Sequence, residues 1–274
     1  LEKYSRSILM TSKITGLDGN LLLHFFRGLY NKNNLSNIFP SKELIIPKII
    51  HQVWLGGVVP ECFKDLMQSW INSHLDGWQY ILWTDKEAED FQMHSREFYD
   101  QADNYGVKSD ILKMEVIYKY GGVYIDTDFE CLRPLDILHY TYDFYIGIQP
   151  LDSQFLQLGF GIFGARAGHP ILRHCIETIK DDWHEKGAPK KTGPVHLTKS
   201  FWAVAETQGM TDIAFPASYF YPLSCMQKTA ERDQWVLQGA FGIHWWAKSW
   251  MPSCFRPKQF KNIANEISTK SWND

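Results

Sequence analysis

Two aspartates separated by a single residue close the most informative segment of this 274-residue chain, Tyr120-Gly121-Gly122-Val123-Tyr124-Ile125-Asp126-Thr127-Asp128. The apolar run after the glycines is typical of a strand, along which successive side chains point to opposite faces. Asp126 and Asp128 are therefore expected to share a face, where their charges repel each other unless a cation lies between them. Mg²⁺ and Mn²⁺ prefer such oxygen ligands and keep positions free for the phosphate oxygens of a substrate. Because open α/β sheets bind ligands at the carboxyl ends of their strands, the pair predicts a site for a metal-bound diphosphate.

Taken alone, this triplet has a plainer interpretation as a polar strand exit or a turn. The segment before it favours the functional interpretation. Residues 109–120 carry apolar side chains every four positions, which predicts an amphipathic helix. Ser109 is a candidate N-cap for this helix, and Gly121 is a candidate left-handed C-terminal cap.

An acid and a base lie close together in this predicted helix. Asp110 and Lys113 are three positions apart, so they are neighbours on one helix face. The plainer interpretation of Asp110 is an ordinary first-turn acid favoured by the helix dipole. Beside the paired aspartates, however, the two side chains would form a polar cluster with contacts for sugar hydroxyls and phosphate.

The order of these segments resembles a known family. Ser-Asp-Ile-Leu-Lys (109–113), followed by Ile-Tyr-Lys-Tyr-Gly-Gly-Val-Tyr-Ile-Asp-Thr-Asp (117–128), resembles the sugar transferases defined by a DXD motif. That family includes the Golgi α-1,6-mannosyltransferases of yeasts, and the glucosylating domains of large clostridial toxins are more distant relatives. The resemblance runs from about residue 46 to residue 250. Further segments agree with the family in order and type, namely 46–57, Ser69-Trp70, 82–85, 168–170, 192–194 and 244–250.

The resemblance implies roles for individual residues of the donor site. Asp110 would hydrogen-bond hydroxyls of the donor's sugar or ribose. Lys113 stands where the family more often has arginine, so its contact would be less directional than that of a planar guanidinium. Trp54, at the end of the first strand, could be a core residue or could stack on a nucleobase, and the resemblance favours nucleoside binding. Tyr124, inside the motif, is assigned to the same donor site.

The resemblance also brings in residues near the end of the matched region. His244 would be the third metal ligand beside Asp126 and Asp128, since imidazole is an acceptable ligand for manganese. Its plainer interpretation is a structural or exposed histidine. Ser249 and Trp250 resemble a flexible lid that closes over the diphosphate and excludes water.

Together these assignments predict a metal-dependent hexosyltransferase that uses Mn²⁺ or Mg²⁺. The donor would be a nucleotide diphosphate sugar, with a UDP-sugar preferred to GDP-mannose, and the acceptor a hydroxyl of a glycan or a protein. The catalytic residues would be Asp110, Asp128 and Trp250. The resemblance implies retention of the anomeric configuration, and no residue is identified as a covalent nucleophile.

Two other classes of protein are considered. A non-catalytic carbohydrate-binding module would fit the aromatic content of 15% but needs no diphosphate site. A metal-dependent nucleotidyl- or phosphotransferase would also use two carboxylates, but it would normally carry a glycine-rich phosphate loop, which we do not expect here.

Composition limits the remaining possibilities. A net charge of −3 does not suggest a nucleic-acid partner. The five cysteines form no CxxC pair, and Cys62 and Cys175 are expected to be small core residues. This usage favours a reducing, cytoplasmic compartment, while a secreted effector or the lumenal domain of a longer protein stays open. No apolar run reaches the length of a transmembrane helix, which gives the expectation that this chain has no such segment.

Alternation of strand and helix patterns predicts an α/β fold with a mainly parallel central sheet flanked by helices, of the GT-A glycosyltransferase type. We expect three regions: a helical N-terminal extension (1–45), a catalytic domain (46–252) and a C-terminal tail (253–274). The expected strands are 48–54, 78–83, the Val123 strand and 143–149. The expected helices are 60–74, 88–103, 109–120, a helix after Pro170, and 196–207.

Overall fold

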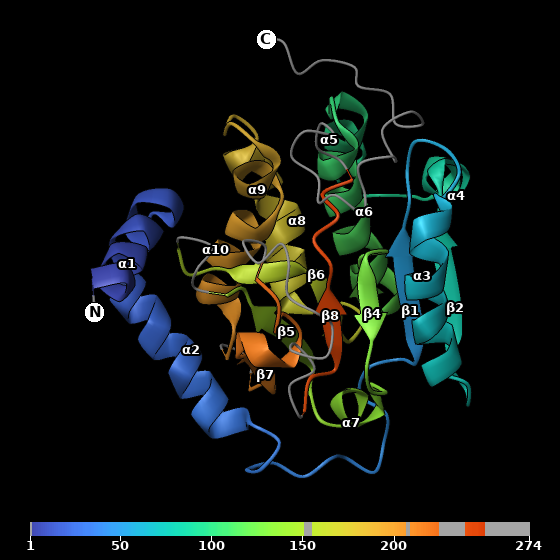
Figure 1. Ribbon diagram of the computed structural model, residues 1–274. Coiled ribbons are helices and arrows are strands. Elements are labelled where there is room, and N and C mark those ends of the chain that lie inside the picture. Colours follow the sequence, from blue (N-terminus) through green and yellow to red (C-terminus); the bar gives the residue numbers. More distant parts are fainter. Residues whose placement is uncertain (1, 151–154, 207–208, 225–238, 250–274) are drawn as a thin grey trace.

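A computed structural model gives the fold of the chain and describes residues 2–150, 155–206, 209–224 and 239–249. A six-stranded sheet with the order β2-β1-β3-β6-β5-β7 forms its centre (Figure 1). Five of these strands run parallel to one another and β6 runs the other way, so the prediction of a mainly parallel sheet is confirmed. A small antiparallel sheet pairs β4 with β8. The strands are β1 (Ile49–Val53), β2 (Gln79–Trp83), β3 (Gly122–Ile125), β4 (Phe129–Cys131), β5 (Phe144–Ile148), β6 (Leu158–Ala165), β7 (Asp212–Phe215) and β8 (Gly242–His244).

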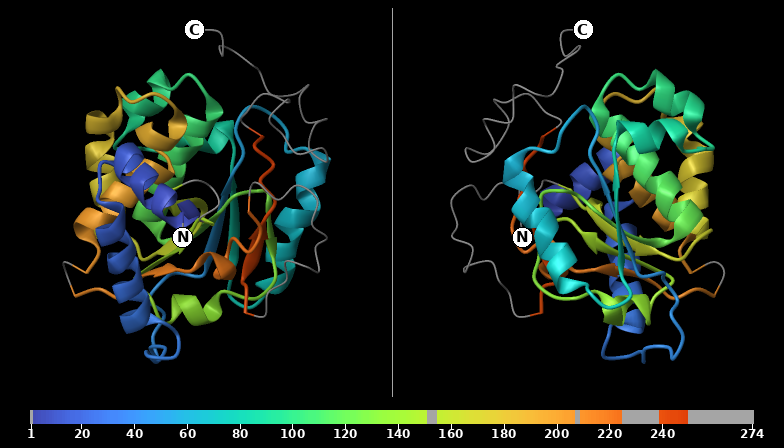
Figure 2. Two further views of the ribbon diagram at one scale, coloured as in Figure 1. Left: turned by 60° about the vertical axis from the view of Figure 1, so that its left-hand side comes forward. Right: turned by 90° about the vertical axis from the view of Figure 1, so that its right-hand side faces the viewer.

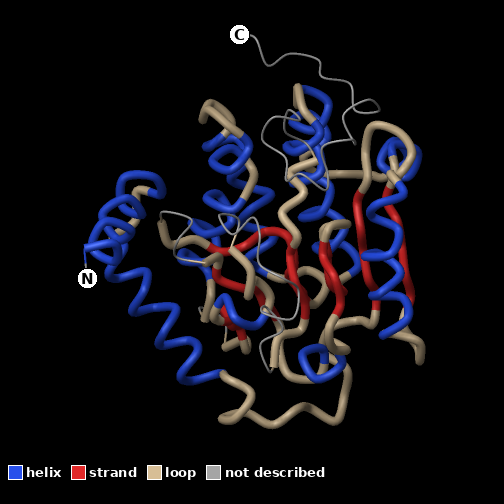
Figure 3. Tube along the Cα trace, in the orientation of Figure 1, coloured by secondary structure: helices blue, strands red, loops and turns tan. Residues whose placement is uncertain are grey.

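Helices cover both faces of the large sheet (Figures 2 and 3). The helices α6, α8 and α10 pack on one face, and α3, α7 and the small sheet pack on the other. The helices are α1 (Glu2–Thr15), α2 (Gly19–Asn33), α3 (Glu61–Ser73), α4 (Asp85–Asp90), α5 (Arg96–Gln101), α6 (Tyr105–Tyr120), α7 (Asp136–His139), α8 (Pro170–Asp182), α9 (Ala188–Lys191), α10 (Pro194–Val204) and the 3₁₀-helix η2 (Ala217–Tyr219).

The first two strands and the helix between them form the predicted βαβ unit. β1 and β2 are parallel neighbours, and α3 buries its apolar stripe of Phe63, Met67 and Trp70. Because a parallel pair needs a crossover connection, the helix is required by the strand direction. Because β1 also runs parallel to β3, the carboxyl ends of these two strands lie at the same edge of the sheet.

The glycine pair between α6 and β3 is required by its surroundings. Gly121 ends α6 with a φ of +67°, as its predicted capping role demands, and Gly122 has a φ of +103°. A Cβ on Gly122 would lie 2.5 Å from the carbonyl oxygen of Ile49 in the neighbouring strand. These two positions let β3 enter the sheet directly against β1.

Two predicted helix boundaries are wrong. The helix expected over 88–103 is split into α4 and α5, because the carboxylate of Glu115 on α6 accepts the backbone N–H of Ser95 and holds the intervening turn against the core. The helix expected to begin at Ser109 begins at Tyr105 instead. The side chain of Asn104 caps it by accepting the backbone N–H of Val107.

Strand β6 was not predicted, because it is rich in glycine, which is unfavourable in strands. Its residues 159–164 (Gly-Phe-Gly-Ile-Phe-Gly) have the spacing of a dinucleotide-binding loop, contrary to the expectation that no glycine-rich motif occurs. They lie inside a strand and not at a strand-to-helix turn, so they cannot form such a loop. Gly159 and Gly164 make room for aromatic rings, since a Cβ would come within 2.3 Å of Tyr221 and 2.2 Å of Tyr145.

The N-terminal helices pack on the main body of the chain. Leu22, Phe26 and Leu29 of α2 are buried in the same core as α6 and α8, and α2 lies beside β7. The expectation for Cys62 is wrong, because its side chain is exposed, whereas Cys175 is buried as expected. Among the described helices, none combines the length and apolarity needed to span a bilayer.

Two buried histidines, His51 and His139, form hydrogen bonds that connect strands of the large sheet to neighbouring segments. Nδ1 of His51 accepts the indole N–H of Trp83, so its Nε2 must carry the proton that is donated to the carbonyl oxygen of Gly121. His139 lies between the carbonyl oxygen of Ile46 and the hydroxyl of Tyr145. Burial lowers the pKa of His51 to about 4 and that of His139 to about 3. Both rings are therefore held neutral in the folded chain.

These shifts predict a loss of stability in mild acid. The unfolded chain binds protons at these histidines from about pH 6.5 downward while the folded chain does not, so the free energy of unfolding falls as the pH decreases below 6.5. Each histidine contributes roughly 1.4 kcal/mol per pH unit in that range. Urea unfolding at pH 7 and pH 5 measures the slope. His139→Gln should make it shallower and the exposed-residue control His24→Gln should not. Equal slopes in all three proteins would contradict the assignment.

Candidate active site

A cavity of about 310 Å³ opens at the carboxyl edge of the sheet. The ends of β1 and β3, the first half of α6, the start of β6 and the segment after β8 all contribute to its wall. The cavity is lined by every predicted site residue within the described part of the chain, namely Trp54, Asp110, Lys113, Tyr124, Asp126, Asp128, His244 and Ser249. Trp250 lies outside the described residues.

The paired aspartates lie in a turn and not on a strand. β3 ends at Ile125, and the backbone N–H of Phe129 donates to the carbonyl oxygen of Asp126 at 3.1 Å, which closes the turn. The strand-face argument for Asp126 and Asp128 is therefore wrong in its geometry. The turn nevertheless directs both carboxylates into the cavity, because its start is fixed by β3 and its end by β4.

His244 faces both carboxylates from the neighbouring strand β8. It pairs directly with Phe129 in the small sheet, and its ring stacks on that phenyl ring with 4.6 Å between centroids. Its Nε2 atom lies 3.0 Å from Oδ1 of Asp128 and 3.9 Å from Oδ2 of Asp126. One ligand atom from each of the three residues lies within 4.8 Å of the others.

This donor set fits a hard divalent ion. Adjacent ligands of an octahedral ion at about 2.1 Å lie about 3 Å apart. The distance from His244 to Asp128 has this value, and the distance from His244 to Asp126 is 0.9 Å longer than the 3.0 Å to Asp128, at 3.9 Å. Two carboxylates and one imidazole suit manganese. The Nδ1 atom of His244 is buried and has no hydrogen-bond partner among the described residues, whereas Nε2 lies within hydrogen-bond distance of Oδ1 of Asp128.

The charges of the two aspartates differ because their surroundings differ. Burial raises the pKa of Asp126 to about 6, the nearby Asp128 adds to this rise, and Lys113 opposes it. Burial alone would also raise the pKa of Asp128, but His244 and the backbone N–H of Ala247 outweigh it, so that pKa is lowered. Negative charge is thus concentrated on Asp128 and is more weakly held on Asp126.

Hydrogen bonds fix each carboxylate from a different part of the chain. The hydroxyl of Tyr124 donates to Oδ1 of Asp126 at 2.6 Å. Oδ2 of Asp128 accepts the backbone N–H of Ala247 at 2.7 Å, and its carbonyl oxygen accepts the N–H of Trp245. Tyr124 is almost fully buried, so it acts on the carboxylate from inside the core.

The segment after β8 has a strained backbone. Trp246 and Lys248 both have a φ of +53°, a region that residues with side chains rarely occupy. The indole N–H of Trp246 donates to the carbonyl oxygen of Leu223, and Asp128 holds the residues on either side of it. The turn with the aspartates therefore determines the conformation of this cavity wall.

Asp110 and Lys113 form a buried ion pair in the same cavity. Nζ of Lys113 lies 2.7 Å from Oδ1 of Asp110, and both side chains are nearly inaccessible to solvent. Nζ of Lys113 also lies 3.8 Å from the ring centroid of Phe160 and 5.0 Å from that of Tyr124. Burial raises the pKa of Asp110, while Lys113 and the hydroxyl of Thr192 oppose the rise. Asp110 is therefore a second-turn residue with specific partners and not an ordinary first-turn acid.

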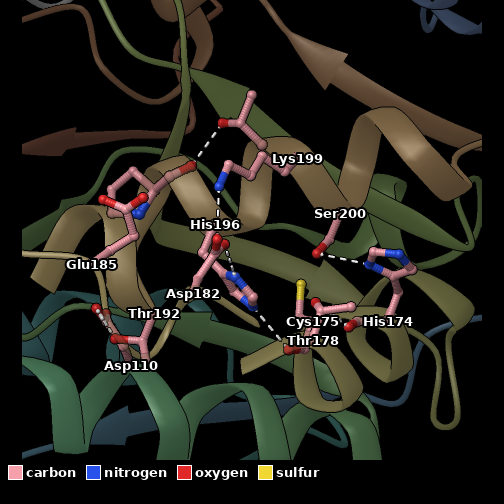
Figure 4. Close-up of polar contacts among 12 residues, drawn as sticks. Asp110, His174, Cys175, Thr178, Asp182, Glu185, Thr192, His196, Lys199 and Ser200 are labelled. Carbon is pink, nitrogen blue, oxygen red and sulfur yellow. Dashed lines mark hydrogen bonds and ion pairs between the residues drawn. The ribbon is translucent and has the colours of Figure 1, made fainter. Parts of the chain in front are cut away.

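A second group of polar side chains, on α8, on α10 and in the loop between them, lies beside Asp110 (Figure 4). The hydroxyl of Thr192 donates to Oδ2 of Asp110. A few residues later, His196 on α10 lies between the carboxylate of Asp182 on α8 and the carbonyl oxygen of Cys175, each at 2.8 Å. Both of these partners can accept hydrogen bonds from the ring. This cluster joins α8 to α10 and so fixes the loop that carries Thr192.

Trp54 contacts both the hydrophobic core and the cavity. Its side chain is 6% exposed and packs on Phe63 of α3, with 5.1 Å between ring centroids. It also lines the cavity beside the first half of α6. A base could therefore contact one part of the indole while another part remains in the core.

Several residues of the site could not be identified from sequence. Phe160, Gln149 and Gln157 line the cavity without belonging to a recognisable motif. Gly161 is needed there because a Cβ would lie 2.8 Å from Oδ2 of Asp126. Residues 192–194 agree with the family in order and type, but no sequence pattern indicates the contact between Thr192 and Asp110.

Comparison with known proteins places part of the chain within a sequence family. Residues 60–145 match the family described as "Glycosyltransferase sugar-binding region containing DXD motif". The chain is 42% identical over 167 residues to "Inositol phosphoceramide mannosyltransferase 2" of Schizosaccharomyces pombe, a match that covers 58% of this chain and 47% of that protein. It is 32% identical over 147 residues to "Inositol phosphoceramide mannosyltransferase 3" of the same yeast, covering 52% and 39%. The chain thus spans less than half the length of these two relatives.

A solved structure shares the fold. The "PaToxG Glycosyltransferase" superposes with a TM-score of 0.53 at 17% identity, over 74% of this chain and 79% of that one. At this identity the likeness concerns the fold alone. The resemblance to the DXD-motif sugar transferases is confirmed: residues 60–145, which contain both aspartates, match the model of that family's sugar-binding region, and the fold is of the GT-A type.

Proposed function

We propose that this chain is a divalent-metal-dependent glycosyltransferase that moves a hexose from a nucleotide diphosphate sugar to an acceptor hydroxyl. The observation that carries the proposal is the convergence of Asp126, Asp128 and His244 in a cavity that also contains the Asp110–Lys113 pair. A carbohydrate-binding module would have no need for three potential metal ligands at the floor of its cavity.

The three converging residues would hold the ion. A bound Mn²⁺ or Mg²⁺ would neutralise the charge that develops on the departing diphosphate. Asp128 and His244 are already fixed by hydrogen bonds or stacking, so little reorganisation is required of them. Asp126, whose pKa is raised, must be deprotonated to serve as a ligand.

The remaining residues would bind and orient the donor. Asp110 would accept hydrogen bonds from the donor's sugar or ribose hydroxyls, and Lys113 would keep that carboxylate in place while adding positive charge. The indole of Trp54 would contact the base. Ser249 and Trp250 would follow the strained segment after β8 and cover the diphosphate, which would exclude water from the reacting carbon. Retention of configuration is carried over from the resemblance.

Assays with panels of donors and acceptors identify the two substrates. Mannose is the first sugar to test because the two yeast relatives are named mannosyltransferases, although the sequence-based preference is for a UDP-sugar. Their names also place inositol phosphoceramide in an acceptor panel, beside glycans and proteins. Incubation with Mn²⁺ and a panel of UDP- and GDP-sugars, scored for donor hydrolysis, transfer and protection against thermal unfolding, tests the proposal. Absence of both turnover and protection with every donor would contradict it.

Removal of the metal or of one ligand should abolish turnover while the fold persists. Asp128→Asn keeps the shape of the side chain but loses its charge, so we expect transfer to fall by about 100-fold or more, as for the loss of a main electrostatic contact in a transition state. Asp136→Asn, which removes a carboxylate on α7 away from the cavity, is the matched control. Transfer is measured with and without EDTA, and full activity in excess EDTA would overturn the metal assignment.

Replacement of Trp54 separates donor binding from core packing. Trp54→Leu keeps an apolar side chain in the core but removes the aromatic face, so we expect the donor KM to rise by roughly 5- to 150-fold if base stacking contributes about 1–3 kcal/mol. Phe63→Leu, in the same cluster but outside the cavity wall, should lower the melting temperature without this change in KM. A Trp54→Leu protein with a lower melting temperature and an unchanged KM would make Trp54 a core residue only.

A further inference from the structure

A pair of glutamine side chains in the cavity wall has no part in the site described so far. Gln149 follows β5 and Gln157 precedes β6, and both line the cavity that contains the aspartates. The pairing of β5 with β6 shifts register between Ile146 and Ile148. After this shift the backbone N–H of Gln149 donates to the carbonyl oxygen of Gln157 at 3.0 Å. The two residues therefore lie opposite each other, with their side chains on one face.

The amide groups of this pair have a fixed orientation. Nε2 of Gln157 donates to Oε1 of Gln149 at 2.7 Å. The adjacent backbone is also fixed, because the N–H of Leu158 donates to the hydroxyl of Thr198 on α10. Both glutamines are more than nine-tenths buried. Side chains held in this way lose little further freedom when a ligand binds.

The pair leaves one donor and one acceptor unused. Oε1 of Gln157 is buried and has no hydrogen-bond partner among the described residues. Within the described part of the chain, the hydrogen bond of the Gln149 side chain is made by Oε1, which leaves the N–H groups of Nε2 available to donate. A buried polar atom without a partner is costly, so its retention in a cavity wall indicates a ligand group that satisfies it. A hydroxyl group can accept from one amide and donate to the other.

We propose that Gln149 and Gln157 form a subsite for a neutral sugar hydroxyl, which comes from the transferred hexose or from the acceptor. This inference rests on the proposed function and deepens it. The pair is uncharged, in contrast to the Asp110–Lys113 pair in the same cavity, so it suits a hydroxyl better than a carboxylate or a phosphate. Recognition by a buried amide pair would make these residues determinants of sugar specificity.

Binding measurements on the full chain with Mn²⁺ separate the possible outcomes. GDP, GDP-mannose, UDP and UDP-glucose are titrated into wild type, Gln157→Met and Gln149→Met, with exposed Gln92→Met as the matched control. If the hydroxyl belongs to the donor hexose, both cavity variants should weaken the nucleotide sugar by about 3- to 10-fold and leave the free nucleotide unchanged. The double variant should lose no more than either single one, because the residues act as a pair.

If the hydroxyl belongs to the acceptor, donor binding and donor hydrolysis should stay at wild-type values, while the acceptor KM rises by a similar factor in the transfer assay. Either pattern supports the subsite. Unchanged donor affinity and unchanged acceptor KM in two folded variants would overturn it while leaving the proposed function intact. A wild-type chain that binds none of the four nucleotides would overturn both. Gln149→Met serves in place of Gln157→Met if the latter fails to fold.

Discussion

Asp126 and Asp128 repel each other, and the organisation of the site depends on the contacts that hold them close together. Tyr124 reaches Asp126 from the core of the large sheet, and His244 and the N–H of Ala247 reach Asp128 from β8. The two contacts of Asp128 join parts of the chain that are more than 100 residues apart. They leave negative charge directed into a cavity, where a divalent cation would relieve the repulsion.

The fold supplies these contacts through a few positions at which no larger residue fits. Gly122 lets β3 lie against β1, which brings the end of β3 to the cavity. Gly161 leaves space for the carboxylate of Asp126. The same edge of the sheet receives Trp54 from β1 and the glutamine pair from β5 and β6. The cavity therefore gathers side chains from the ends of four strands, as expected of an open α/β sheet.

Much of the fold follows from local sequence patterns. The first two strands with the helix between them, the helix after Pro170 and the cap at Gly121 were predicted correctly, since apolar periodicity and backbone geometry act locally. Strand β6 was missed because its glycines matter only through Tyr145, Tyr221 and Asp126, which pack on it from elsewhere in the chain. The helix α6 begins earlier than predicted because the side chain of Asn104 caps it by accepting the backbone N–H of Val107.

The candidate site was predictable where it depends on a motif. Asp126 and Asp128 stand out by spacing alone, although they lie in a turn, whereas His244 could be placed beside them only through the resemblance. Lys113 is a neighbour of Asp110 on the same helix and was expected, but Thr192, the other partner of Asp110, comes from a distant loop that no pattern near Asp110 indicates. Gln149 and Gln157 face each other only because two strands shift register, which no local pattern indicates.

The most direct test of this account is a titration of Mn²⁺ followed by the electron paramagnetic resonance signal of the free ion. We expect wild type to bind one ion per chain, more tightly in the presence of a nucleoside diphosphate, and Asp126→Ala to lose this binding while keeping its folded circular dichroism spectrum. A free-ion signal that wild type leaves unchanged even with GDP or UDP present, or equal binding by Asp126→Ala, would contradict the claim that these carboxylates form a metal–diphosphate site.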